Sequence, residues 1–171
     1  MTAEPVTVER RIAARPETVF SFFAERWLSW ISKDGEFSFE PGGAYRANVT
    51  GGRFLELDSP KRLVFTWGGE TGETPVPPGF ATVEITLRPE GEGTLLRLVH
   101  HDLPAQACAP HEQGWAHYVE RLAVRAEGGG PGPDHWVERP GPRSPGGERA
   151  GLTGCPGSAA TLPTLMRSDL R

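Results

Sequence analysis

The side chains in this chain whose types and spacing could do chemistry are its histidines, which all lie between positions 100 and 135. They are His100, His101, His111, His117 and His135. His100 and His101 are neighbours in a strand-like segment, so their side chains are expected on opposite faces. His111 and His117 are six residues apart and share a helical face poorly. The spacing therefore predicts no metal site.

His100 is the histidine best placed for a functional role. It shares strand parity with Leu96 and Leu98, whereas Arg97 has the opposite parity, so the His100 side chain is expected to face the interior. An imidazole there could orient a ligand or act as an acid or base, because its pKa lies near working pH. The alternative is a buried histidine bonded to the backbone or to a carboxylate. No nucleophile–base pair accompanies His100, so no catalytic residue is predicted.

Composition excludes several classes of protein. The net charge is −4 and the isoelectric point is about 5.8, which is unlike the basic surface of a nucleic-acid-binding protein. The sequence contains no run of eighteen apolar residues, so no membrane span is predicted. The N-terminal stretch "MTAEPVTVERR" lacks the apolar core of a secretory signal. No phosphate-loop or dinucleotide motif is present, so no cofactor is expected. These features predict a cytoplasmic protein.

The C-terminal quarter differs from the rest in composition. From Gly128 to Arg171, Gly and Pro fill 17 of 44 positions, counted as 10 Gly and 7 Pro. Such a segment has too few large apolar residues to offset the entropy of ordering. We therefore expect a folded domain over residues 1–127, a domain edge over 128–136 and a disordered low-complexity tail over 137–171.

The folded part begins with one strand and a helical segment. "PVTVERRIA" alternates weakly and reads as a strand. Phe20, Phe23, Trp27 and Ile31 then recur at spacings of three and four, which predicts one helical face on either one helix or two short ones with a bend. About six short strands follow, with Tyr45 and its neighbours alternating and "PEGEG" closing a hairpin. Sequential strands with short loops favour an antiparallel sheet.

The last predicted element is a helix over residues 111–127. Trp115, Val119, Leu122 and Ala126 share one face, with Tyr118 beside them. A helix of this length, ~25 Å, is long enough to cross a curved sheet. Gly114 costs about 1 kcal/mol there relative to Ala. A glycine at this position indicates either that another backbone segment lies close to the helix near Trp115, or that glycine is simply tolerated near the helix end.

Five stretches, in this order, resemble one protein family. They are "ERRIAARPETVFSFF", "FEPGGAYR", "LELDSPKRLVFTW", "GTLLRLVHHDLP" and "HEQGWAHYVERLA". The family is the Hsp90-ATPase-activator-homologue-like family of the START/birch-pollen-allergen-like superfamily, and the resemblance covers about residues 5–127. It implies an α+β helix-grip fold. In that fold a curved antiparallel sheet of six to seven strands surrounds a long C-terminal helix, two short helices follow strand 1, and a cavity lies between sheet and helix.

The family by itself implies little about function, and we expect a non-catalytic ligand-binding protein that holds a small apolar or amphipathic molecule in that cavity. A chaperone co-factor acting through a surface is one alternative, and a cyclase- or hydrolase-type enzyme using His100 is another. We expect a small apolar ligand or a chaperone as partner, and a monomer or homodimer. The residues expected to line the pocket are Trp27, Phe37, Phe39, Tyr45, Phe65, Trp67, His100, Trp115, Tyr118, Val119 and Leu122.

Overall fold

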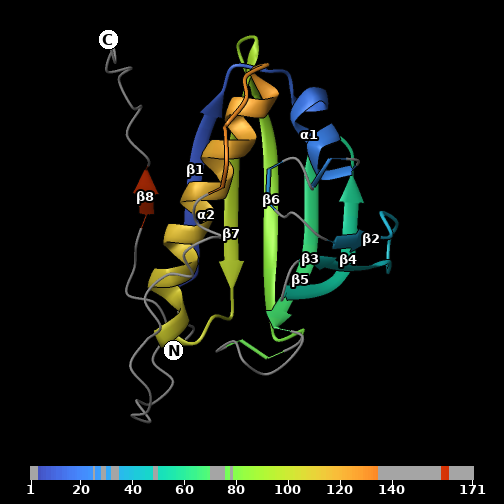
Figure 1. The fold of residues 1–171 in the computed structure, drawn as a ribbon, viewed down its shortest axis with the longest axis vertical. Coiled ribbons are helices and arrows are strands. Elements are labelled where there is room, and N and C mark those ends of the chain that lie inside the picture. Colours follow the sequence, from blue (N-terminus) through green and yellow to red (C-terminus); the bar gives the residue numbers. More distant parts are fainter. Residues whose placement is uncertain are drawn as a thin grey trace.

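The computed structural model describes residues 4–24, 26–27, 30–31, 35–47, 50–69, 76–77, 79–134 and 159–161. These residues form one sheet and two helices, shown in Figure 1. The strands are β1 (Val6–Ile12), β2 (Gly35–Phe37), β3 (Ala44–Ala47), β4 (Thr50–Asp58), β5 (Arg62–Gly69), β6 (Ala81–Glu90), β7 (Gly93–His101) and β8 (Ala159–Thr161). The helices are α1 (Pro16–Ala24) and α2 (Ala105–Ala126).

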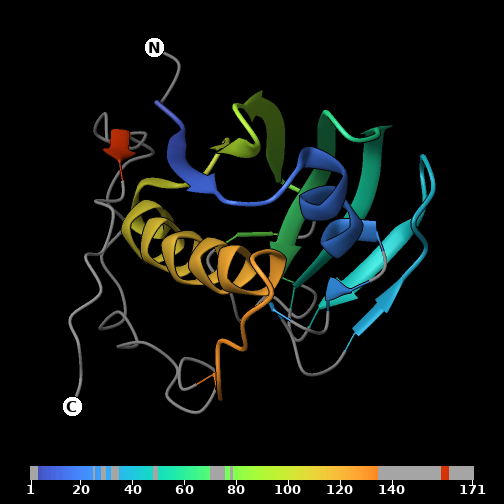
Figure 2. The same cartoon turned by 90° about the horizontal axis from the view of Figure 1, so that it is seen from above.

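The sheet has the strand order β2-β3-β4-β5-β6-β7-β1-β8. Strands β1 to β7 pair antiparallel with their neighbours, and only β8 runs parallel to β1. The sheet curls so that α2 lies along its concave face, with α1 beside the other half of the sheet (Figure 2). The expected helix-grip fold is confirmed.

The central hairpin shows why these segments form strands with one buried face. In β6, Val83 and Ile85 are at most 1% exposed, while the residues between them are partly exposed. Val83 pairs with His100 and Ile85 with Leu98 of β7, so the apolar parities of both strands meet on the concave face. His100 therefore faces the interior, as its parity predicts, and it is 0% exposed.

The helical segment after β1 is interrupted. Helix α1 begins at Pro16, whose fixed φ suits the first helical turn, and ends at Ala24. Trp27 and Ile31 then lie in a separate turn, in which the Ile31 N–H donates to the Trp27 carbonyl at 3.0 Å. Residues 25, 28–29 and 32–34 lie outside the described part. The predicted face holds across the bend, because all four of its members are buried.

Helix α2 begins six residues earlier than predicted. It starts at Ala105, directly after Pro104, and continues through Pro110 to Ala126. Pro110 lacks the N–H for one helical bond, which favours a helix boundary at that point in the sequence. The first turns are held instead by burial, since Ala107 is 0% and Cys108 5% exposed. The predicted start at residue 111 is therefore wrong.

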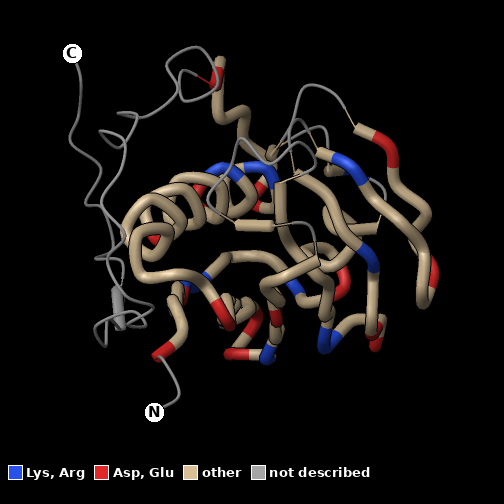
Figure 3. The backbone as a smooth tube through the Cα atoms, turned by 90° about the horizontal axis from the view of Figure 1, so that it is seen from below, with Lys and Arg blue, Asp and Glu red and all other residues tan. Residues whose placement is uncertain are grey.

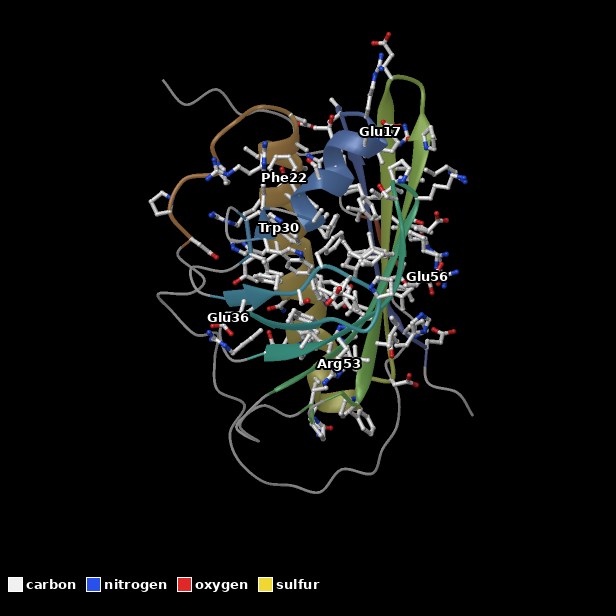
Figure 4. The ribbon with its side chains drawn as sticks, turned by 90° about the vertical axis from the view of Figure 1, so that its right-hand side faces the viewer. Glu17, Phe22, Trp30, Glu36, Arg53 and Glu56 are labelled. Atoms are coloured by element: carbon white, nitrogen blue, oxygen red, sulfur yellow. The ribbon has the colours of Figure 1, made fainter. Side chains whose placement is uncertain are left out.

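The convex face of the sheet is charged. Lys, Arg, Asp and Glu positions lie close together on the side facing away from α2 (Figure 3). Glu56 lies on this side, whereas Phe22 and Trp30 lie on the helix side (Figure 4). Arg62 contacts Glu56 at 3.7 Å and Glu84 at 3.5 Å. The charged residues of the strands thus cover the solvated face.

The chain after α2 turns back along the helix. His117 contacts the carboxylate of Asp134 at 2.8 Å, and Asp134 is 6% exposed. Arg121 donates to the carbonyls of Gly132 and Pro133. Of the predicted tail over 137–171, only β8 is described, and the rest lies outside the described residues. The expectation of a disordered tail stays a prediction.

Candidate functional site

Eight of the eleven residues predicted to line a pocket belong to two groups of aromatic rings, which also include Phe54 and His111. We call Trp27, Phe37, Phe39, Tyr45, Phe54 and Phe65 the packed aromatic cluster, and Trp67, His100, His111 and Trp115 the imidazole–indole cluster. Phe65 contacts Trp67 with ring centroids 6.4 Å apart, so the clusters adjoin. Val119 and Leu122 are core residues at 1% and 0% exposure, and Tyr118 packs against the core half-buried.

The packed aromatic cluster joins the turn after α1 to strands β2 to β5. The Trp27 ring stacks on Phe37 at 5.2 Å and on Tyr45 at 5.9 Å. Its indole N–H donates to the Phe23 carbonyl, and the Tyr45 hydroxyl donates to the Thr66 carbonyl at 2.6 Å. Burial raises the pKa of Tyr45 well above its usual value, so the hydroxyl stays protonated. The polar atoms of Trp27 and Tyr45 are therefore satisfied by backbone groups.

The imidazole–indole cluster lies where α2 crosses β5 and β7. The Trp115 indole N–H donates to His100 Nδ1 at 2.9 Å, and the Trp67 indole N–H donates to His111 Nε2 at 3.2 Å. His111 Nδ1 lies 2.8 Å from the Ala107 carbonyl, one turn earlier in α2. The two imidazole rings contact each other with centroids 5.2 Å apart. Strands β5 and β7 are thus each joined to α2 by one indole–imidazole hydrogen bond.

These bonds assign the tautomers of both histidines. A nitrogen that accepts an indole N–H carries no proton, so neutral His111 holds its proton on Nδ1 and donates it to Ala107. Neutral His100 holds its proton on Nε2, and that buried atom has no hydrogen-bond partner among the residues that the structure describes. Burial, and then the nearby His111 and His101, lower the pKa of His100 well below its usual value. Burial also lowers the pKa of His111. Both rings are neutral at pH 7.

A small pocket of about 130 Å³ opens beside this cluster. Its lining is largely apolar and consists of Trp67, Pro110, His111, Gly114, Trp115 and Tyr118. A Cβ built on Gly114 would meet no atom within 4 Å, so the missing side chain leaves room in the pocket. The alternative expectation, that Gly114 permits close backbone approach near Trp115, is wrong. Trp67, Trp115 and Tyr118 line this pocket as a group, whereas the other eight predicted residues do not.

Sequence reasoning missed three lining residues: Pro110, His111 and Gly114. The signal for His111 is its spacing, because residues 111, 115 and 118 lie at intervals of four and three on one helical face. Because the predicted helix began at residue 111, His111 was not assigned to its buried face. The contact between His111 and His100 joins residues from two elements and follows from no spacing within either one.

The cluster is poorly arranged for acid–base catalysis. A general base needs a free lone pair within reach of a proton. In both imidazoles the lone pair is engaged by an indole N–H, and the remaining nitrogen carries a proton. Within the described ranges, no three His, Cys, Asp or Glu side chains are grouped so that they could hold a metal ion. The arrangement offers apolar contact and one buried N–H donor.

A larger groove lies at the end of the sheet and on its convex face. It has a volume of about 820 Å³. It is lined by Glu9, Pro16, Glu17, Asp58, Pro60, Lys61, Arg62, Thr86, Leu87, Arg88, Pro89, Leu95 and Arg97. Charges of both signs border a few apolar side chains, and Arg97 already pairs with Glu9 at 3.5 Å. None of the predicted pocket residues lies in this groove.

Neither described helix is long and apolar enough to cross a membrane.

A search of curated proteins found no match. Among solved structures, an AHSA1-like protein from Rhizobium etli is 40% identical over 86% of this chain and 96% of that chain, with a TM-score of 0.61.

Two further solved structures share the fold at lower identity. CalU16 from Micromonospora echinospora is 22% identical over 75% of this chain and 88% of that chain, with a TM-score of 0.61. An HSP90 activator from Plasmodium falciparum is 20% identical over 71% of this chain and 95% of that chain, also with a TM-score of 0.61. The family model described as activator of Hsp90 ATPase homolog 1-like protein matches residues 13–127. With two thirds of its length matched, the chain belongs to this family.

Proposed function

We propose that this protein binds a small apolar molecule in the pocket between β5 and α2. The observation that carries the proposal is the pocket of about 130 Å³ walled by Trp67, Trp115 and Tyr118. An apolar cavity of about 150 Å³ is large enough to hold benzene. The ligand, or its buried end, is therefore about the size of one small ring. The other predicted lining residues would then support the pocket from the core.

The lining residues give the pocket a rigid wall on one side and an adaptable rim on the other. Trp67 and Trp115 contact each other with centroids 5.0 Å apart, and each is bonded to an imidazole. Tyr118 is only half-buried, and burial together with Asp134 raises its pKa to about 12, so its hydroxyl stays neutral. Fixed aromatic walls favour apolar ligands because little side-chain entropy is lost on binding.

The test uses Gly114, because added side chain there would enter the pocket. Gly114→Leu should abolish binding of a small cyclic hydrocarbon, measured by quenching of tryptophan fluorescence, while the folded state persists. Gln113→Leu adds the same side chain at an exposed position of the same helix and should leave binding unchanged. Equal binding by both variants, or no binding by the unmodified protein, would contradict the proposal.

A second candidate is a chaperone co-factor that acts through a surface. The family description and the open, mixed-charge groove on the convex face favour it. Lys61 and Arg88 line this groove, and neither forms an ion pair within the described part of the chain. The double variant Lys61→Glu and Arg88→Glu should then remove any stimulation of an Hsp90-type ATPase. An ATPase rate that the unmodified protein does not change would exclude this candidate.

The geometry gives less support to an enzyme using His100. Its Nδ1 already accepts from Trp115, so taking a proton from a substrate would first require breaking that bond. Histidine would act here as a donor.

A further inference from the structure

The four rings of the imidazole–indole cluster contain a surplus of donors. Each indole offers one N–H and no acceptor, and each neutral imidazole offers one N–H and one acceptor nitrogen. Four N–H groups therefore face two acceptor nitrogens. Both acceptor nitrogens are used by the indoles, and His111 donates its own N–H to Ala107. The single group left over is the Nε2–H of His100.

This leftover donor is fully buried. His100 is 0% exposed, and its ring contacts Trp67 at 6.0 Å, His111 at 5.2 Å and Trp115 at 6.0 Å. All three of these neighbours line the pocket, whereas His100 lies behind them. A buried donor without a partner destabilises the folded state relative to a satisfied one. A molecule that brought an acceptor to this atom would remove this destabilisation.

We propose that the pocket takes a small neutral molecule with one hydrogen-bond acceptor, such as a cyclic ketone, whose oxygen accepts the Nε2–H of His100. The inference rests on the proposed function and narrows it to a ligand class. The ring of the ligand lies against Trp67 and Trp115. Because His100 is buried and is not part of the pocket lining, the His111 ring has to shift for the oxygen of the ligand to reach Nε2.

The chemistry of the cluster also excludes other ligand classes. A ligand that carries only a donor finds both imidazole acceptor nitrogens already engaged. An ammonium ion would find no free acceptor nitrogen on these four rings and would lose its hydration on entry, which is unfavourable. The hydroxyl of Tyr118 is hydrogen-bonded to Asp134, which lies on the segment after α2. The preference is therefore for an acceptor without charge.

Three probes of one size and shape test this preference on the full chain. They are cyclopentanone, methylenecyclopentane and cyclopentylammonium, which differ in a single polar group. Cyclopentanone should bind about tenfold tighter than the alkene, the gain expected from satisfying a buried donor. The ammonium probe should bind more weakly than either.

The residue is tested by His100→Met, whose thioether can still accept from the Trp115 N–H but which has no N–H of its own. His101→Met is the matched control on the opposite face of the same strand. His100→Met should make ketone and alkene bind equally, and His101→Met should keep the tenfold preference. In the unmodified protein, the Nε2 resonance of His100 in a long-range ¹H–¹⁵N spectrum should shift with the ketone and not with the alkene. This measurement holds even if His100→Met does not fold.

The outcomes separate the two proposals. Equal binding of ketone and alkene to the unmodified protein, or a ketone preference that survives His100→Met, overturns the inference and leaves the proposed function standing. An unmoved Nε2 resonance with ketone bound also overturns it. If no probe binds at all, the proposed function itself is overturned and the inference falls with it.

Discussion

The packed aromatic cluster and the imidazole–indole cluster are built from similar residues and differ in how their polar atoms are satisfied. In the first, Trp27 and Tyr45 donate to backbone carbonyls. In the second, Trp67 and Trp115 donate to other side chains, and one imidazole N–H is left over. Only the second adjoins the small pocket against α2. Backbone partners satisfy both donors of the packed aromatic cluster, whereas the side-chain partners of the imidazole–indole cluster leave one N–H over, which is the group that the proposed ligand would use.

The largest expected effects come from truncating one indole in each cluster. Trp27→Ala and Trp115→Ala should each lower the free energy of unfolding by about 3–5 kcal/mol, because both side chains are at most 3% exposed. Total stability is about 5–15 kcal/mol, so either variant leaves a marginal domain. Urea unfolding measures the loss. A Trp115→Ala variant that unfolds like the unmodified protein would show that this indole does not anchor α2.

The second prediction concerns pH and applies to the imidazole–indole cluster alone. The folded state keeps His100 and His111 neutral because their pKa values are lowered, while the unfolded chain takes up protons below about pH 6.5. Stability should be complete above that pH and fall as pH drops below it, by about 1.4 kcal/mol per pH unit for each histidine. The free energy of unfolding, measured at pH 7.5, 6.5 and 5.5, checks this prediction.

Two variants identify the group that causes this dependence of the free energy of unfolding on pH. His100→Gln keeps an oxygen that can accept from Trp115 but does not titrate, so it should lose about half of the pH dependence in that range. Tyr45→Phe, in the other cluster, should keep all of it. A slope that is unchanged in His100→Gln would mean that other groups cause it.

The sequence predicted the two clusters unequally well, and the reason is physical. Apolar periodicity fixes which face of an element is buried, so the inward placement of Trp27, Tyr45 and His100 followed from spacing alone. Whether a buried ring is core or site depends on its partners. The Trp115–His100 bond joins α2 to β7, and no periodicity within one element contains it. The pocket was missed for a second reason. Pro110 favours a helix boundary, whereas α2 continues through it from Ala105.

A smaller effect is expected from Tyr45→Phe itself. The change removes the hydroxyl that donates to the Thr66 carbonyl at 2.6 Å and keeps the ring in place. The loss should be about 1 kcal/mol, the net value of one hydrogen bond. Binding of cyclopentanone should not change, because Tyr45 lies outside the pocket. A weaker affinity would show that the two clusters act as one site.

The smallest expected effect is a gain in stability from Gly114→Ala, and it depends on the space beside the imidazole–indole cluster. A methyl group there meets no atom within 4 Å, and alanine favours a helix over glycine by about 0.5–1 kcal/mol. The thermal midpoint should rise accordingly. The matched change in the other region is Gly52→Ala, at the strand position paired with Tyr45. There a Cβ would lie 2.1 Å from the Thr66 carbonyl oxygen, so the strands must separate and stability must fall. The opposite signs of two glycine-to-alanine changes would distinguish the open region from the packed one, and a loss of stability in Gly114→Ala would show that its helix face has no free space for a ligand.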